Sequence, residues 1–171
     1  MKKISLFFVI LILLGCENNP LKQPMSISVN CPLIFFAKEH KTYIQSVSND
    51  ISLDDISYVS EINNAKFTKK CLVKNGIFYG QISILFVARP LSESEENIKL
   101  NYYIASLGQE KNLTDMQYYS SNGVFNKNSE TDKLIETEII IEKNISFSYP
   151  DNVSSIVIGF MLDEKKLKLL Y

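Results

Sequence analysis

The sequence predicts a mainly β protein: an antiparallel β-sandwich of the immunoglobulin-like kind, with about seven strands and a short C-terminal helix. Three observations favour this class. Short segments rich in β-branched and aromatic residues recur along the chain. Polar, turn-forming residues separate these segments. Long stretches with helical periodicity are missing, so a parallel sheet built from alternating strands and helices is not expected.

The start of the chain matches a bacterial lipoprotein signal. Lys2 and Lys3 precede the apolar run Leu6–Leu14, and Gly15-Cys16 follows it. Nine apolar residues suit a signal peptide and fall short of the roughly 20 that span a bilayer. Cleavage would remove residues 1–15 and leave Cys16 to carry lipid. A short buried helix with an incidental cysteine is the alternative.

The lipid on Cys16 predicts a protein held at a bilayer in the cell envelope, facing the periplasm. Glu17 follows the cysteine, where an aspartate would favour the inner membrane, so the outer membrane is somewhat favoured. Residues 16–30 contain Pro20 and Pro24 and lack periodicity, which predicts a flexible tether. Residues 31–171 are then the β-sandwich domain, long enough for one core.

The first half of this domain divides into short strands and one hairpin. Leu33 to Ala37 is the first expected strand, and the polar stretch from His40 to Asp55 is expected to be a loop. The next strand starts at Ile56. Its apolar residues change parity, which predicts a bulge near Asn63-Asn64. Asn75-Gly76 lies between apolar runs and predicts a tight type I′ hairpin turn.

A long central strand comes next. Gly80 to Arg89 is apolar on both parities, and Pro90 ends it before an acidic loop. Leu100 to Leu107 is the following strand. We expect turns at Gly108–Asn112 and at Asn122-Gly123, with Asp115–Tyr119 continuing the pairing between them.

The C-terminal part of the chain has the clearest alternation of apolar and polar residues. Leu134 to Glu142 places isoleucines on one face and glutamates on the other, which predicts a half-buried strand. Ile145, Phe147 and Tyr149 continue at period two, and Ile156 to Leu162 is the last expected strand. Asp163 suits the N-cap of a short helix over Glu164–Leu170.

Cysteine usage predicts one disulfide. The chain has three cysteines, and the lipid uses Cys16. Cys31 and Cys71 remain in a compartment that permits disulfides. Two buried free thiols or a metal site are the alternatives. His40 would be one further ligand for a metal, whereas structural zinc sites use four.

Catalytic patterns are weak. His40 is the single histidine, and no Gly-x-Ser-x-Gly motif, zinc motif or phosphate-binding loop occurs in the sequence. No catalytic residue, metal or cofactor is therefore expected. A formal net charge of −1 gives no basic excess for nucleic acid. Acidic clusters occur at Asp54-Asp55, at Glu93, Glu95 and Glu96, and at Glu136 and Glu138.

Three aromatic pairs could line a sugar or peptide groove. They are Phe35-Phe36, Tyr102-Tyr103 and Tyr118-Tyr119. Adjacent residues of a strand point to opposite faces, so we expect one ring of each pair in the core and the other at the rim.

Several short motifs resemble a family of uncharacterised alphaproteobacterial lipoproteins. The matching residues, spread over most of 31–171, are Cys31-Pro32, Asp55-Ile56-Ser57-Tyr58 with Ile62, Cys71, Ala88-Arg89-Pro90, Tyr102-Tyr103-Ile104-Ala105 and Ile158-Gly159-Phe160-Met161-Leu162. The resemblance implies a disulfide-linked β-domain and no catalytic residues. This chain departs from the family by having Asn, Lys and Ile in place of many alanines and arginines.

The sequence does not name an activity. The leading hypothesis is a membrane-anchored envelope lipoprotein that binds or scaffolds another envelope protein without catalysis. The alternative is a cell-envelope hydrolase that uses paired carboxylates, which would face each other across a cleft at about 5–10 Å.

Overall fold

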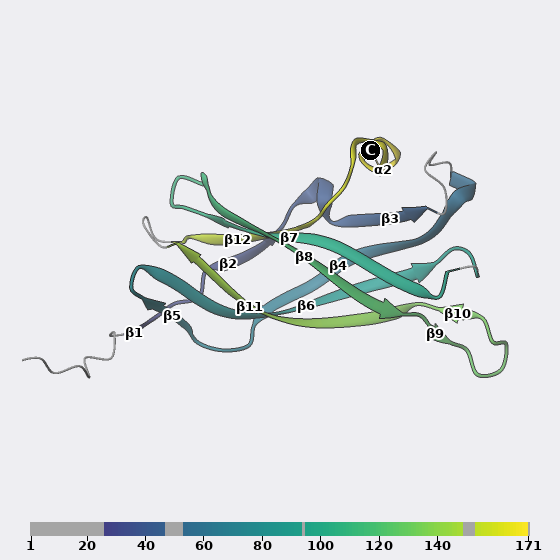
Figure 1. Ribbon diagram of the computed structural model, residues 1–171, viewed down its shortest axis with the longest axis horizontal. Coiled ribbons are helices and arrows are strands. Elements are labelled where there is room, and N and C mark those ends of the chain that lie inside the picture. The colour runs from purple at the N-terminus through teal and green to yellow at the C-terminus, as the bar shows by residue number, and fades with distance from the viewer. Residues whose placement is uncertain (1–25, 47–52, 94, 149–152, 171) are drawn as a thin grey trace, which may run out of the picture.

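The computed structural model describes residues 26–46, 53–93, 95–148 and 153–170. Within these ranges the protein is mostly β, with one short C-terminal helix (Figure 1). The expected signal peptide at residues 1–15, Cys16 and the tether up to residue 25 lie outside the described residues, as does Tyr149. Among the described elements, no helix is long and apolar enough to cross a membrane.

The larger sheet, which we call sheet A, has the strand order β1-β5-β6-β4-β3, and β11 pairs with the other edge of β6. All of its pairs are antiparallel. Its strands are β1 (Ser26–Val29), β3 (Thr42–Ser46), β4 (Ile56–Phe67), β5 (Cys71–Lys74), β6 (Ile77–Pro90) and β11 (Thr137–Ser148). Since β6 has neighbours on both sides, the predicted central strand is confirmed.

The second sheet, sheet B, has the order β2-β12-β7-β8. It consists of β2 (Leu33–Phe36), β7 (Asn97–Leu107), β8 (Leu113–Val124) and β12 (Ser155–Phe160). The β2–β12 pair is parallel, and the other two pairs are antiparallel. A small hairpin of β9 (Asn126–Lys127) and β10 (Leu134–Ile135) extends one end of the molecule (Figure 1). The described strands outnumber the seven expected because several are very short.

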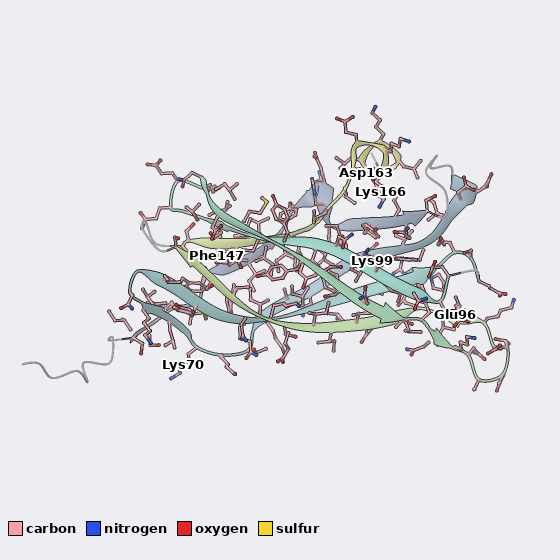
Figure 2. All side chains as sticks on the ribbon, in the orientation of Figure 1. Lys70, Glu96, Lys99, Phe147, Asp163 and Lys166 are labelled. Carbon is pink, nitrogen blue, oxygen red and sulfur yellow. A yellow bond between two sulfur atoms is a disulfide. The ribbon has the colours of Figure 1, made fainter. Side chains whose placement is uncertain are left out.

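The two sheets enclose a shared apolar core (Figure 2). Phe86 of sheet A lies 5.2 Å from Tyr102 and 5.5 Å from Phe160 of sheet B, measured between ring centroids. Tyr43 contacts Phe160 in the same layer, at 5.4 Å. Burying these large rings on both inner faces is the main stabilising contribution to such a sandwich. Other fully buried members are Ile62, Ile82, Ile84, Ile98, Leu100, Ile104 and Phe147. The predicted β-sandwich is thus confirmed.

Two predicted local features are confirmed, and one is wrong. Asn75 and Gly76 both have positive φ, 52° and 72°, as a type I′ turn requires. The β4–β6 register shifts between Ile62 and Asn64, where the bulge was expected. The predicted turn at Asn122-Gly123 does not exist. Both residues lie within β8, paired with Lys99 and Ile98 of β7.

Two segments are more regular than expected. Ser26–Val29, placed in the tether by the sequence, forms β1 and pairs with β5. The predicted loop from His40 to Asp55 contains β3, whose Tyr43 and Ile44 are buried.

The C-terminal helix α2 (Glu164–Leu170) is confirmed and lies beside β3 (Figure 1). The Asp163 side chain accepts a hydrogen bond from the Lys166 amide at 2.9 Å, as an N-cap should.

Candidate binding surface

The predicted disulfide joins Cys31 and Cys71, with Cα atoms 5.2 Å apart. Cys71 is fully buried at the start of β5, opposite Val29 of β1, and Cys31 lies between β1 and β2. The bond uses both sulfur atoms, so neither the free-thiol nor the metal alternative holds. Because β1 belongs to sheet A and β2 to sheet B, the disulfide fixes the chain where it passes from one sheet to the other.

His40 is held in place by contacts with β12 and β7. It ends a short 3₁₀ helix, Lys38–His40, and is half-buried. Its Nδ1 lies 2.9 Å from the Phe160 carbonyl oxygen, so this nitrogen must donate the hydrogen. The ring packs edge-on against Tyr103, 5.7 Å away between centroids. Both contacts hold the ring in place beside β12.

The acidic clusters are largely solvated. Asp54, Glu93, Glu96, Glu136 and Glu138 are exposed. Glu136 forms an ion pair with Arg89, and Glu96 forms one with Lys127 at 2.9 Å. Exposed ion pairs of this kind contribute only about 0–1 kcal/mol to stability.

A polar depression of about 470 Å³ lies near one end of the sandwich. Its lining residues are Gln45, Tyr58, Glu95, Asn97, Ile98, Lys99, Asn122 and Gly123. Glu95 is the one carboxylate among these described residues, so the paired acids of a glycan hydrolase do not meet here.

Tyr58, at the base of this depression, has a structural role. Its hydroxyl group accepts a hydrogen bond from the Lys99 amide at 2.8 Å and donates one to the Lys99 carbonyl oxygen at 2.9 Å. Burial raises the pKa of Tyr58 to about 12; the Lys99 hydrogen bond lowers it, and Tyr43 and Glu95 raise it further. The hydroxyl group is thus protonated at neutral pH and occupied by the backbone of β7.

The aromatic pairs follow the expected division. Tyr102 is fully buried while Tyr103 is half-buried on the other face. Tyr119 stacks on Tyr102 at 5.5 Å, whereas Tyr118 is 63% exposed. In the third pair Phe36 packs against the core and Phe35 is 51% exposed. Each pair therefore sends one ring outward, and all three outward rings belong to sheet B.

The strand register brings these outward rings onto one continuous surface. Directly paired residues share a face of a sheet. Phe35, Val157, Ala105 and Met116 form one row across all four strands. Adjacent rows contain Leu33, Ser155, Leu107 and Leu113, and Gly159, Tyr103 and Tyr118. We call this surface the apolar face of sheet B. None of the residues in these three rows carries a charge.

Tyr103, in one outer row of the apolar face, is held in place by its neighbours. A Cβ atom added to Gly159 would lie 2.5 Å from the Tyr103 hydroxyl oxygen and 2.9 Å from His40 Cβ. The tyrosine side chain therefore occupies the space that the glycine leaves, and His40 supports it from the side. Burial raises the pKa of the Tyr103 hydroxyl.

The sequence indicates which residues of each strand point outward on this face, but not which strands lie side by side to form it. Tyr103, Ala105 and Leu107 are visible as the second apolar parity of one strand. On one side that strand pairs with residues 155–160, which in turn pair with residues 33–36, and no local pattern indicates these pairings.

Comparison with known proteins gives little guidance. No family model matches the chain, so the lipoprotein resemblance stays a prediction. No solved structure matches it either. One curated match is a polyamine aminopropyltransferase from Buchnera aphidicola subsp. Schizaphis graminum (strain Sg), 28% identical over 144 residues. The alignment covers 78% of this chain and 49% of that protein, so the chain spans about half the length of this relative. That identity is too low to assign the chain to a family.

Proposed function

We propose that the protein is an envelope lipoprotein, anchored through an acylated Cys16, that acts as a non-enzymatic binding module. The apolar face of sheet B is the surface that contacts a protein partner. The observation that carries this proposal is the exposure of large apolar side chains on that face, around the buried Ala105 and Ser155: Leu33 is 67% exposed, Tyr118 63% and Leu113 57%. Contiguous apolar surface of this kind marks interaction sites in proteins that are otherwise water-soluble.

Two further features support the proposal. The Cys31–Cys71 disulfide suits an oxidising compartment outside the cytoplasm. The face also combines rigid aromatic rings with a polar surround, a composition found at the centres of protein interfaces. The hydrolase alternative depends on paired carboxylates, and the described residues that line the depression beside Tyr58 include one carboxylate, Glu95.

Site-specific photocrosslinking in the bacterium that makes the protein tests the proposal. A photoreactive phenylalanine analogue at Tyr118 should capture one protein partner. The matched control carries the analogue at Ile140, which is 68% exposed on the outer face of sheet A. Equal capture at both positions, or none at Tyr118, would contradict the proposal.

A further inference from the structure

One end of the sandwich combines exposed lysines with exposed apolar side chains. Lys69, Lys70 and Lys74 flank or end β5, all exposed, and they form no ion pair with a carboxylate of the described residues. Between and beside them lie Leu72, 38% exposed, and Ile77, 37% exposed. We call this set the basic end.

The opposite end carries more acids than bases. Lys127 and Lys133 lie there, and Lys127 pairs with Glu96. The acids around the β9–β10 hairpin and the loop after β6 are Glu93, Glu95, Glu96, Glu130 and Asp132. Figure 2 shows Lys70 and Glu96 toward opposite ends of the long axis. A charge difference along the axis favours one orientation of the molecule at a charged surface.

The chain enters the domain at the basic end. Ser26 begins β1 and pairs with Lys74, next to the Asn75-Gly76 turn. Nine residues, 17–25, separate Ser26 from Cys16. At roughly 3.3–3.6 Å per extended residue they reach about 30 Å, so a lipid on Cys16 would keep this end near the bilayer.

We propose that the basic end rests on an anionic lipid surface. Lys69, Lys70 and Lys74 lie at the headgroups, and Leu72 and Ile77 enter the interface between headgroups and acyl chains. This inference rests on the proposed anchoring at Cys16.

Tryptophan fluorescence tests the orientation, because the chain contains no tryptophan. The full-length protein with Ile77→Trp is reconstituted into phosphatidylglycerol vesicles whose acyl chains carry bromine, which quenches nearby tryptophan. The matched control is Val124→Trp, 59% exposed near the opposite end. We expect emission from Ile77→Trp to shift to shorter wavelength and to fall by roughly half, with little change for Val124→Trp. Leu72→Trp is a second reporter in case Ile77→Trp does not fold.

Charge reversal then tests the role of the lysines. Lys70→Glu with Lys74→Glu should lower the quenching of Ile77→Trp in phosphatidylglycerol to the level found in phosphatidylcholine. Equal quenching at both reporter positions, or no quenching in protein that still floats with the vesicles, overturns the docking and leaves the anchoring intact. Protein that does not float with the vesicles overturns both.

Discussion

The hydroxyl group of Tyr58 on β4 bonds to both backbone groups of Lys99 on β7. Lys99 lies beyond the last residue of β7 that pairs with β12, since that ladder ends at Tyr102. The Tyr58 hydroxyl group, from sheet A, thus makes the backbone hydrogen bonds that β12 does not make to this part of β7 in sheet B. This contact joins the two sheets where the polar depression opens.

Tyr58→Phe should lower the free energy of unfolding by about 1–3 kcal/mol, because the Lys99 amide and carbonyl would lose their partner in a partly buried place. Urea unfolding measures the loss. Tyr118→Phe, at an exposed ring, is the control and should change stability by less than about 0.5 kcal/mol. Equal effects of the two substitutions would contradict the role given to Tyr58.

Stability should fall at alkaline pH. An unfolded tyrosine ionises near pH 10, and the pKa of Tyr58 in the folded state is about 12. The folded state therefore favours the protonated form, and this stabilisation is complete below about pH 10 and is lost as pH rises through 12. Burial likewise raises the pKa of Tyr43, Tyr102, Tyr103 and Tyr119. Unfolding measured between pH 8 and 12 should show the decline, with a smaller slope for Tyr58→Phe. A flat profile over this range would argue against buried hydroxyl groups.

Gly159→Ala should displace Tyr103 from the apolar face. The new methyl group would overlap the Tyr103 hydroxyl oxygen and press on His40. We expect a loss of about 1–3 kcal/mol, the usual cost of overpacking. In a Tyr103→Ala background the same change should cost less, and a double-mutant cycle measures the difference. Additive effects would show that the two residues do not compete for space.

Cys71→Ala should cost about 2–5 kcal/mol of stability, because the unfolded chain would lose a cross-link between residues 40 apart. Cys31→Ala should cost a similar amount, and the double variant little more than either. Denaturant unfolding measures all three. Mass spectrometry of the wild-type protein should find neither thiol free, and detection of both free thiols would refute the bond.

Cys16→Ser should block lipidation and leave an unprocessed precursor, because the lipid and the cleavage both require the cysteine thiol. The mass of the purified product and its partition into detergent report the change. Cys31→Ser is the matched control and should still be processed and acylated. An acylated mature product from Cys16→Ser would contradict the lipoprotein interpretation.

Local chemistry explains which parts of the fold were predictable from sequence. The Asn75-Gly76 turn depends on two residues that tolerate positive φ, and the β4 bulge follows from a change of apolar parity. The same dipeptide, Asn122-Gly123, led to the wrong prediction of a turn within β8. Gly123 lies in β8, where an added Cβ would meet the Ile139 side chain at 2.9 Å. That glycine reflects close approach between β8 and β11 rather than a turn.

The sequence analysis missed β1, β3 and the apolar face of sheet B for one reason. Each of them depends on contacts with residues that are distant in the sequence. β1 is a strand because β5 lies beside it, and β3 because Tyr43 can reach Phe160 across the core. Neither partner is visible within the local window. The apolar face of sheet B likewise requires β2 beside β12, a pair separated by about 120 residues of sequence. The sequence predicts which residues point outward from each strand but not which strands stand together.

The parallel pairing of β2 with β12 also has a consequence for how the protein is made. Sheet B pairs β2, one of the first strands of the domain, with β12, its last strand. This sheet therefore cannot form completely before nearly the whole chain has been synthesised. Loop closure over this distance slows folding and leaves β7 with an exposed edge in the meantime. The Cys31–Cys71 bond needs only the first part of the domain. It can therefore form before the C-terminal strand joins the sheet, and it holds the early strands in place until β12 pairs with β2 and β7.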